Sequence, residues 1–522
     1  MAEYKNNIPK EKFAFVHHGE QISDKKFEDK PIGYFKDAWI RFRKSKASVV
    51  AAIIILCIML YSVLMPLLIT SHDATFMCST YAKKPSRVTW LRDFGIATGG
   101  VDRNTNEAGY IKLLAIGAGA QSGKGEAVSL KEGMNSPYQP VMHTGTPYTQ
   151  EMGKKTTYYP ITVDTYLEVG FLYTSVEQAE YNRILAWQEQ TGIQVLYPMV
   201  DTRNEYCFDS EDANCWYKTT GKAVPVQVGA DGKAKRLTYS EDMVLQDNYL
   251  RNEDGTVKYF VPVGGGTAET AQCKIRVLYY NYYQYLYGAE PNYFMGTDSQ
   301  GYDLALRIAG GIQMSLLVAI SVSVINFLIG AAYGAVEGYY GGTTDIVLCR
   351  VTDILAGVPF IVVATLFQIH LSQKVGAIPS LLFAYVLTGW IGTSERVRTQ
   401  FYRFKNQEYV MAARTLGARD SRIIWKHIFP NTLGTIITSS ALVIPGVILT
   451  ESMLSFLGII KLGTAEATSL GTLLSDASGI WTQYPHLMLY PALVISLLMI
   501  CFNLFGNGLR DAFNPALRGV ED

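Results

Sequence analysis

The sequence predicts an all-α polytopic membrane bundle of six transmembrane helices with a large extracellular domain, of mixed α and β structure, inserted between helices 1 and 2. Apolar segments of about 20 residues or more, enough to cross a bilayer core as helices, recur along the 522-residue chain. A hydrophilic block at residues 71–300 separates the first of them from the rest. The formal net charge is zero, with 46 basic and 46 acidic side chains, which argues against nucleic-acid binding.

The N-terminal region predicts the orientation in the membrane. Residues 1–30 are mixed in charge and are expected to form a flexible cytoplasmic tail. Residues 31–46 place Trp39 and Phe42 at helical spacing among basic residues, which is typical of an amphipathic helix on the inner membrane surface. Residues 47–70 follow as the first span. Basic residues precede this span and few follow it closely, which places the N-terminus in the cytoplasm and the hydrophilic block outside the cell.

The hydrophilic block has the features of a folded domain that contains strands. Glycine-rich turns occur beside short runs of alternating polarity, at residues 236–239 and 257–263. Residues 277–294 are rich in tyrosine. We expect them at the membrane–water boundary, which tyrosine prefers. A surface on which a ligand stacks is the alternative.

One segment of the block looks like a phosphate-binding loop. Residues 118–125 read AGAQSGKG, but Ala118 and Gly125 stand where that loop needs a glycine and a hydroxyl residue. The chain also lacks a close Ser/His/Asp grouping and a cluster with metal-ligand spacing. We therefore predict a protein that is not an enzyme and that binds no cofactor or metal itself.

Four cysteines of the chain lie in the hydrophilic block. On an exported domain they could form two disulfides. Cys207 with Cys215 is the simplest pairing, and it leaves Cys78 to pair with Cys273. Free thiols are the alternative.

Residues 301–508 contain the five remaining spans. The apolar segments lie at residues 312–336, 346–371, 379–391 with its flanks, 433–457 and 486–505. Pro359 is expected to kink the second of these. Arginine and lysine are frequent in the loops that this order places inside, so the tail at residues 509–522 is also predicted to be cytoplasmic. Polar residues in spans tend to face a bundle interior or a water-filled path, and the candidates for a translocation path are Asn326, His370 and Glu451.

A basic, polar loop at residues 395–431 separates two of these apolar segments. Its first helical pattern places on one face the side chains of Tyr409, Val410, Ala413 and Leu416. Gly417 then permits a turn. Asp420 can cap a second helix, which holds on one face Ile423, Ile424, His427 and Ile428. Pro430 ends that helix or starts the next span. This loop either docks on a partner or only fixes the topology by its positive charge.

The loop resembles the EAA loop of ABC-importer permeases, whose pattern is E-A-A, three residues, G, nine residues and I-x-L-P. Residues 411–413 (MAA) occupy the triplet, Gly417 the glycine and residues 428–430 (IFP) the end. Met411 replaces the glutamate of the triplet, with Glu408 three residues before it, and Phe429 replaces the usual leucine. Further segments resemble the C-type permease subunit of oligopeptide and dipeptide importers, although Tyr302 stands where arginine is usual: residues 294–317, 452–458, 471–476 and 508–515. The resemblance leaves the hydrophilic block uncovered.

This resemblance implies a type I ABC-importer permease in a bacterial plasma membrane, forming half of a path for oligopeptides or dipeptides. The implied partners are a second, homologous permease, two ATPase subunits that bind ATP and Mg, and an extracellular substrate-binding (lipo)protein, besides the peptide and membrane lipids. The residues implied to couple the chain to the ATPases are Glu408, Met411, Ala412, Ala413, Leu416, Gly417, Ala418, Arg419 and Pro430. Two alternatives stay open: the same fold carrying a nickel chelate or glutathione, and a bundle that only anchors an extracellular receptor or adhesin.

Overall fold

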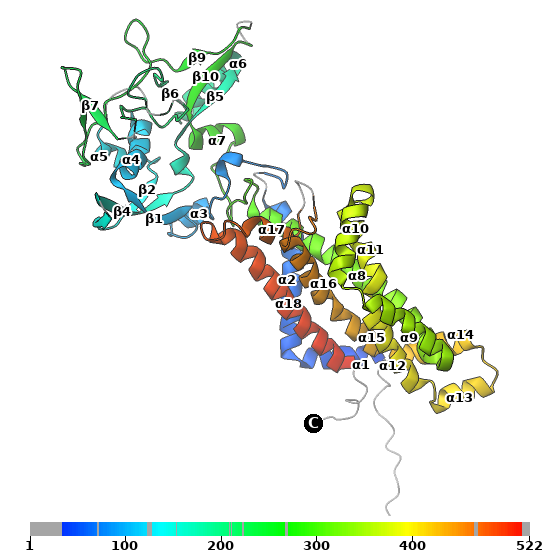
Figure 1. Cartoon of the computed structure of the whole chain (residues 1–522). Coiled ribbons are helices and arrows are strands. Elements are labelled where there is room, and N and C mark those ends of the chain that lie inside the picture. Colours follow the sequence, from blue (N-terminus) through cyan, green and yellow to red (C-terminus); the bar gives the residue numbers. More distant parts are fainter. Residues whose placement is uncertain are drawn as a thin grey trace, which may run out of the picture.

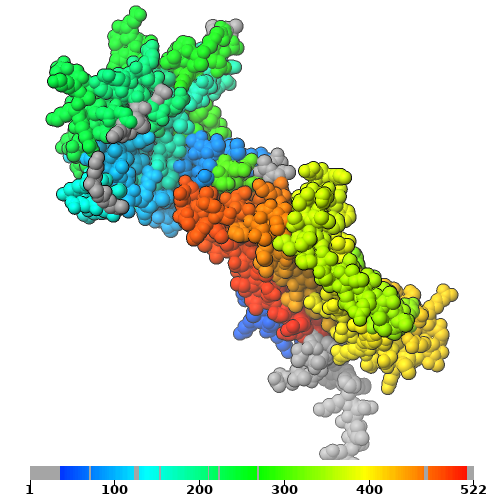
Figure 2. Space-filling model, in the orientation of Figure 1, coloured from blue at the N-terminus to red at the C-terminus, as the bar shows by residue number. Residues whose placement is uncertain are grey.

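The computed structural model describes residues 34–69, 72–122, 128–152, 154–207, 209, 211–221, 224–266, 270–463 and 468–513. The predicted tail at residues 1–30 and the part of the C-terminal tail beyond residue 513 lie outside these ranges. The described chain forms a helical bundle with a domain of sheets and short helices at one end (Figure 1). We call residues 72–303 the inserted domain. The space-filling view shows this domain projecting from the bundle as a separate mass (Figure 2).

The bundle contains the predicted apolar helices. A short helix, α1 (Tyr34–Lys44), precedes α2 (Lys46–Leu68), and the helices after the inserted domain are α8 (Leu304–Tyr340), α9 (Gly342–Ala356), α10 (Phe360–Val375), α11 (Ala377–Thr388), α12 (Ile391–Phe404), α15 (Phe429–Ala441), α16 (Val443–Phe456), α17 (Leu470–Ala477) and α18 (Pro485–Phe513). Five continuous helices in the described ranges are long and apolar enough to cross a membrane: 46–68, 304–340, 377–404, 420–456 and 485–513. The pair α9 and α10 would add a sixth crossing if it acts as one span. It is bent by 70° where Pro359 caps α10, so the predicted kink is confirmed.

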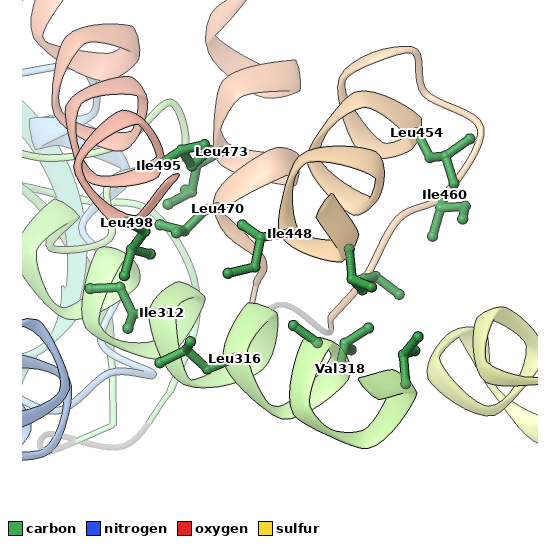
Figure 3. Packing of buried hydrophobic residues seen from close by; sticks show 14 of the residues in the cluster. Ile312, Leu316, Val318, Ile448, Leu454, Ile460, Leu470, Leu473, Ile495 and Leu498 are labelled. Atoms are coloured by element: carbon green, nitrogen blue, oxygen red, sulfur yellow. The ribbon is translucent and has the colours of Figure 1, made fainter. Parts of the chain in front are cut away.

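The core of the bundle lies between α8, α16, α17 and α18. Ile312 and Leu316 of α8 are buried and face the same cluster as Ile448, Leu470 and Leu498 (Figure 3). Lipid tails are as apolar as leucine, so close packing rather than hydrophobicity must hold such helices together in a membrane. The shape of these helices therefore matters more than their composition.

Helices α8 and α12 pack closely against each other. Three glycines at four-residue spacing, Gly330, Gly334 and Gly338, line one face of α8. A Cβ added to Gly330 would lie 2.7 Å from Cβ of Thr393, and one added to Gly338 would lie 2.6 Å from Cβ of Phe401. Small residues at this spacing let two helix backbones approach closely, so α8 and α12 form one tightly packed unit.

The inserted domain is built from antiparallel sheets, which confirms the predicted α+β structure. One sheet has the order β1 (Gly100–Asn106), β4 (Lys154–Asp164), β2 (Val141–Thr144), with β3 (Tyr148–Met152) also paired to β4. A second has the order β5 (Phe171–Glu177), β10 (Gln272–Leu278), β6 (Leu196–Tyr197), with β9 (Phe260–Pro262) also paired to β10. The strands β7 (Val226–Val228) and β8 (Ala234–Arg236) form a hairpin. The helices are α3 (Thr89–Arg92), α4 (Glu107–Gln121), α5 (Leu130–Met134), α6 (Gln178–Thr191) and α7 (Tyr279–Tyr287).

The tyrosine-rich segment is placed differently from the prediction. We expected a belt at the membrane surface, but α7 lies within the inserted domain, and Tyr279, Tyr280 and Tyr283 are buried. Tyr279 and Tyr283 pack with Tyr81 and Tyr293 in an aromatic cluster at the base of the domain, while Tyr280 contacts Tyr138 and Arg87. Tyrosine combines a large apolar ring with a hydroxyl group that can be hydrogen-bonded, so it suits a domain core as well as an interface.

The inserted domain is attached to the start of α8 by polar contacts. Asp303 caps α8, accepting a hydrogen bond of 2.8 Å from the backbone N–H of Ala305, and its Oδ2 lies 2.9 Å from Nε2 of His72. Arg307, one turn into α8, pairs with Asp298 at 3.3 Å. All four side chains of these two pairs are buried. The domain is therefore fixed to the helix rather than joined through a loose linker.

All seven cysteines are free thiols in the structure, so the predicted disulfides are not formed there. Cys78 contacts the hydroxyl of Tyr279, whereas Cys273 lies in a different hydrophobic cluster beside Val176. The two members of the predicted Cys78–Cys273 pair therefore lie in separate clusters. Cys207 and Cys215 are neighbours, and burial together with the adjacent Cys215 raises the pKa of the Cys207 thiol to about 12.

Candidate functional site

The loop between α12 and α15 forms a compact structure at the end of the bundle opposite the inserted domain (Figure 1). It begins with α13 (Glu408–Thr415) and turns at Gly417, whose φ of +79° confirms the predicted glycine turn. It continues through α14 (Asp420–Arg422) and a π-helical segment (Ile423–Ile428) directly into α15. We call residues 408–430 the coupling loop, after the role that the resemblance implies. Pro430 lies in the first turn of α15, where proline is tolerated because its nitrogen needs no acceptor.

The inner face of the coupling loop packs on α8 and α12. Val410 is fully buried and Ala413 nearly so, together with the π-helical residues Ile423, Ile424 and Ile428. Their partners are Ala331, Ala335, Tyr339, Val397 and Phe401. The shared face predicted for the second helix is therefore confirmed for its three isoleucines, and the structure shows that this face is buried, while His427 is half-buried.

The outer face of the loop exposes apolar side chains. Leu416 is 87% exposed and Met411 55% exposed, so Leu416 does not lie on one face with the buried Val410 and Ala413 as predicted. The reason is local: α13 ends at Thr415, and the chain turns at the next residues. Tyr409 is also exposed, with its hydroxyl 3.2 Å from the side-chain amide nitrogen of Asn431. The other exposed residues of the predicted set are Glu408, Ala412, Gly417, Arg419 and Pro430, while Ala418 is half-buried.

A polar group fixes the loop to the end of α8. The hydroxyl of Tyr339 donates a hydrogen bond of 2.6 Å to Oδ1 of Asp420 and accepts one of 3.4 Å from Nη2 of Arg414. Asp420 was predicted to cap the second helix, but Arg419 occupies the cap position. The carboxylate of Asp420 serves instead as a tertiary acceptor. One tyrosine thus joins both helices of the loop to α8.

A second polar network, which the sequence analysis missed, joins α8, α9 and α12. Arg398 donates two hydrogen bonds to Asp345, of 2.6 and 2.7 Å, and the hydroxyl of Tyr402 donates a third of 2.7 Å. Glu337 is buried and accepts from the Cys349 thiol at 2.9 Å and from the Ser394 hydroxyl at 3.2 Å. The glycines at four-residue spacing that end at Gly338 could have indicated, from the sequence alone, that the adjacent Glu337 lies in a tight helix contact.

This network includes a group of possible metal ligands. Atoms of Glu337, Asp345 and Cys349 lie within 4.8 Å of one another. Both oxygens of Asp345 are already paired with the guanidinium of Arg398, which supplies the positive charge that two buried carboxylates need. The arrangement is an ion-pair network that fixes three helices.

The three residues predicted for a translocation path have separate surroundings. Asn326 of α8 is buried against Gly389, the residue that follows α11. A Cβ added to Gly389 would lie only 2.7 Å from Nδ2 of Asn326. Glu451 is buried and accepts hydrogen bonds from Ser315 at 3.1 Å and Ser455 at 3.0 Å. His370 is exposed on α10. Their role in a path stays a prediction.

Comparisons with known proteins cover the bundle. The family described as "Binding-protein-dependent transport system inner membrane component" matches residues 330–519, and "N-terminal TM domain of oligopeptide transport permease C" matches residues 33–83. The oligopeptide transport system permease protein OppC of Bacillus subtilis (strain 168) is 39% identical over 228 residues, which are 44% of this chain and 73% of that protein. The dipeptide transport system permease protein DppC of the same organism is 40% identical over 233 residues, 44% of this chain and 70% of that protein.

Two further matches extend this comparison. OppC of Haemophilus influenzae (strain ATCC 51907 / DSM 11121 / KW20 / Rd) is 42% identical over 227 residues, 43% of this chain and 71% of that protein. A solved structure of the MetNI methionine ABC transporter in an inward-facing conformation gives a TM-score of 0.34 at 14% identity, over 40% of this chain and 96% of that chain. Neither family model covers residues 84–329.

Proposed function

The chain belongs to the family of binding-protein-dependent inner-membrane transport components, as a permease of the oligopeptide and dipeptide type, and on this premise we propose that it forms half of a peptide path driven by partner ATPases through the coupling loop. It is a multi-pass membrane protein, with the type I ABC permease fold and an additional sheet-containing domain. The bacterial plasma membrane, with both termini in the cytoplasm, is part of the proposal.

The observation that carries the coupling role is the contrast between the two faces of the loop. The inner face is buried on α8 and α12, so the loop cannot move independently of these helices. The outer face presents Met411 and Leu416, apolar side chains that are exposed to solvent when no partner is bound. Exposed apolar side chains on a rigid base are typical of a docking surface. A partner that grips this face would move α8 and α12 as rigid bodies.

The partners follow from this arrangement. Two ATP-binding subunits would hold the ATP and Mg and would dock on the coupling loops of two permeases. The second permease would cover an apolar groove of about 570 Å³ on α8 and α9, lined by Leu328, Ile329, Ala332, Tyr333, Val336 and Leu348. An extracellular substrate-binding lipoprotein would deliver the peptide on the side of the inserted domain.

Charge substitutions on the outer face test the coupling role. Leu416→Glu and Met411→Lys should lower peptide uptake into membrane vesicles and the amount of ATP-binding subunit that co-purifies with the permease. Leu286→Glu is the control, because Leu286 is an exposed leucine of α7 in the inserted domain, 42% exposed. Immunoblots of the membrane fraction show whether each variant is inserted normally. Unchanged uptake and co-purification in both loop variants would mean that the loop does not dock on a partner and only fixes the topology by its positive charge.

The cargo is tested separately. We propose a peptide, because the relatives are named oligopeptide and dipeptide permeases. Purification of the complete importer followed by mass spectrometry should identify the partner subunits and a bound peptide. Recovery of a nickel chelate or glutathione in place of peptide would keep the permease role and change the cargo. Recovery of the chain without ATP-binding subunits would favour a receptor or adhesin.

A further inference from the structure

A cavity of about 560 Å³ lies where the end of α2 meets the base of the inserted domain. One wall belongs to the membrane helix and its last turn: Tyr61, Met65, Leu68 and Ile69. The other wall belongs to the inserted domain: Val88, Trp90, Asn292 and Phe294. The volume is in the range of sites that hold small organic molecules. Its walls are largely apolar, and Asn292 adds an exposed amide.

The cavity is continuous with the surface that lipid covers. Leu67 and Leu68 at the end of α2 are each 69% exposed, and α2 is one of the helices apolar and long enough to cross a membrane. Their side chains therefore face hydrocarbon or its boundary with water. Since Leu68 also lines the cavity, an acyl chain that packs on α2 can reach into it without crossing a polar barrier.

The wall formed by the inserted domain presents further apolar side chains. Trp90 is 65% exposed, Phe94 77% and Ile96 59%, all within one loop at residues 88–97. Figure 1 shows α3, which includes Trp90, at the junction of the inserted domain and the bundle. Soluble domains rarely expose three such side chains together unless the patch meets a membrane or a partner. Tryptophan in particular prefers the level of the lipid headgroups.

This loop is held rigidly at its base. The N–H of Val88 donates to the carbonyl of Ala97 at 2.9 Å, which closes the loop. The backbone of Arg87 exchanges two hydrogen bonds with Tyr293, of 3.0 and 2.8 Å. The side chain of Arg87 is fully buried, paired with Asp164 and hydrogen-bonded to Tyr280. The apolar side chains are thus displayed by a fixed structure.

We propose that the loop at residues 88–97 and the adjoining cavity bind phospholipid of the neighbouring leaflet. An acyl chain would enter the cavity along α2, Trp90 would lie among the headgroups, and Phe94 and Ile96 would insert below them. The inserted domain is then seated on the bilayer as well as attached to α8. The inference needs α2 to span a membrane and is independent of the cargo and of the coupling loop.

Quenching of tryptophan fluorescence by brominated acyl chains tests this proposal. The complete importer is placed in nanodiscs made with ordinary or dibrominated phosphatidylcholine, as the wild type and as Trp90→Phe. The difference between the two proteins isolates the fluorescence of Trp90. We expect this difference to be reduced in the brominated discs. The matched control is Trp187→Phe, because Trp187 packs on Tyr285 and belongs to α6, which lies in the part of the inserted domain far from the bundle (Figure 1). The fluorescence of Trp187 should not change.

Aqueous acrylamide supplies the second readout and separates the other occupants. If acrylamide quenches Trp90 and brominated lipid does not, the loop stands in water and the proposal is wrong. If neither quenches it, a protein surface such as the second permease or the binding protein covers the loop, and the proposal is also wrong. A negative result in this experiment does not contradict the permease function, because that function is tested separately by peptide uptake in the coupling-loop variants.

A photoactivatable phospholipid tests the cavity itself. We expect crosslinks to the peptides that contain Val88–Trp90 or Asn292–Phe294, and we expect Leu68→Glu to reduce them, because a carboxylate in the cavity wall repels an acyl chain. Leu64→Glu is the control, since Leu64 is exposed on α2 but does not line the cavity. Equal crosslinking in both variants would mean that the lipid reaches these peptides without entering the cavity, which would contradict the proposed site.

Discussion

The hydroxyl of Tyr339 lies 2.6 Å from Oδ1 of Asp420, so the last turn of α8 is joined directly to the helix that follows the Gly417 turn. Arg414, on the other helix of the coupling loop, reaches the same hydroxyl at 3.4 Å. A force applied to either helix of the loop is therefore transmitted to α8 through one side chain as well as through the apolar contacts beneath it.

Removal of this hydroxyl should weaken coupling more than stability. Tyr339→Phe keeps the ring and loses a hydrogen bond worth about 1 kcal/mol. We expect normal membrane insertion, with less peptide transported for each ATP hydrolysed by the reconstituted importer. Tyr340→Phe is the control, because Tyr340 is the adjacent residue and is 55% exposed. An unchanged transport ratio in Tyr339→Phe would show that the apolar contacts alone carry the motion.

The turn at Gly417 offers a test of backbone conformation without a steric clash. Nothing lies within 4 Å of a Cβ placed there, but its φ of +79° disfavours side chains. Asparagine tolerates this region far better than a β-branched residue does. Gly417→Asn should keep most uptake, and Gly417→Val should lose it, in the vesicle assay. Equal uptake by both variants would mean that the turn need not hold this conformation.

The packing of α8 on α12 predicts opposite effects of the same substitution at two positions. Gly330→Ala places a methyl group 2.7 Å from Cβ of Thr393, and overpacking of this kind costs about 1–3 kcal/mol. Gly310→Ala, on the same helix, meets nothing within 4 Å and should stabilise by about 0.4–1 kcal/mol through the unfolded state. Thermal unfolding of the purified permease in detergent compares the two. A similar midpoint for both would contradict the close contact.

The raised pKa of Cys207 predicts slow alkylation at neutral pH. The thiolate is the reactive form, and with a pKa of about 12 the thiol is almost entirely protonated at pH 7. The rate of reaction with iodoacetamide, followed by mass spectrometry of the peptide, should keep rising with pH beyond pH 9. A rate that levels off near pH 9 would indicate an ordinary thiol. Under an added oxidant the neighbouring Cys207 and Cys215 should form the disulfide that the sequence suggested.

Features that depend on local sequence could be predicted well. The apolar segments, the break at Pro359 and the turn at Gly417 all follow from hydropathy or from the conformational limits of single residues. The burial of Ile423 and Ile428 follows from helical spacing. These inferences need no knowledge of what lies elsewhere in the chain.

Features that depend on distant contacts could not be predicted. The burial of Glu337 depends on a helix distant in sequence, because its partner Ser394 is 57 residues away. The tyrosines of α7 have the composition of an interfacial belt, and only the fold of the inserted domain shows that Tyr279 and Tyr283 are core residues. Leu416 was assigned to the same helical face as Val410 and Ala413 because the end of α13 at Thr415 could not be located from the sequence.

The continuity of α8 has a geometrical consequence. Its first residue follows Asp303, which holds the inserted domain, and its last turn contains Tyr339, which holds the coupling loop. At 1.5 Å per residue, its 37 residues span roughly 55 Å. A tilt of about 10° around one end of such a rod displaces the other end by about 10 Å. In an importer driven at the coupling loop, the inserted domain would rotate with α8 about its contact with the bilayer, and the distance from the far end of the domain to the bilayer would report which way the path is open.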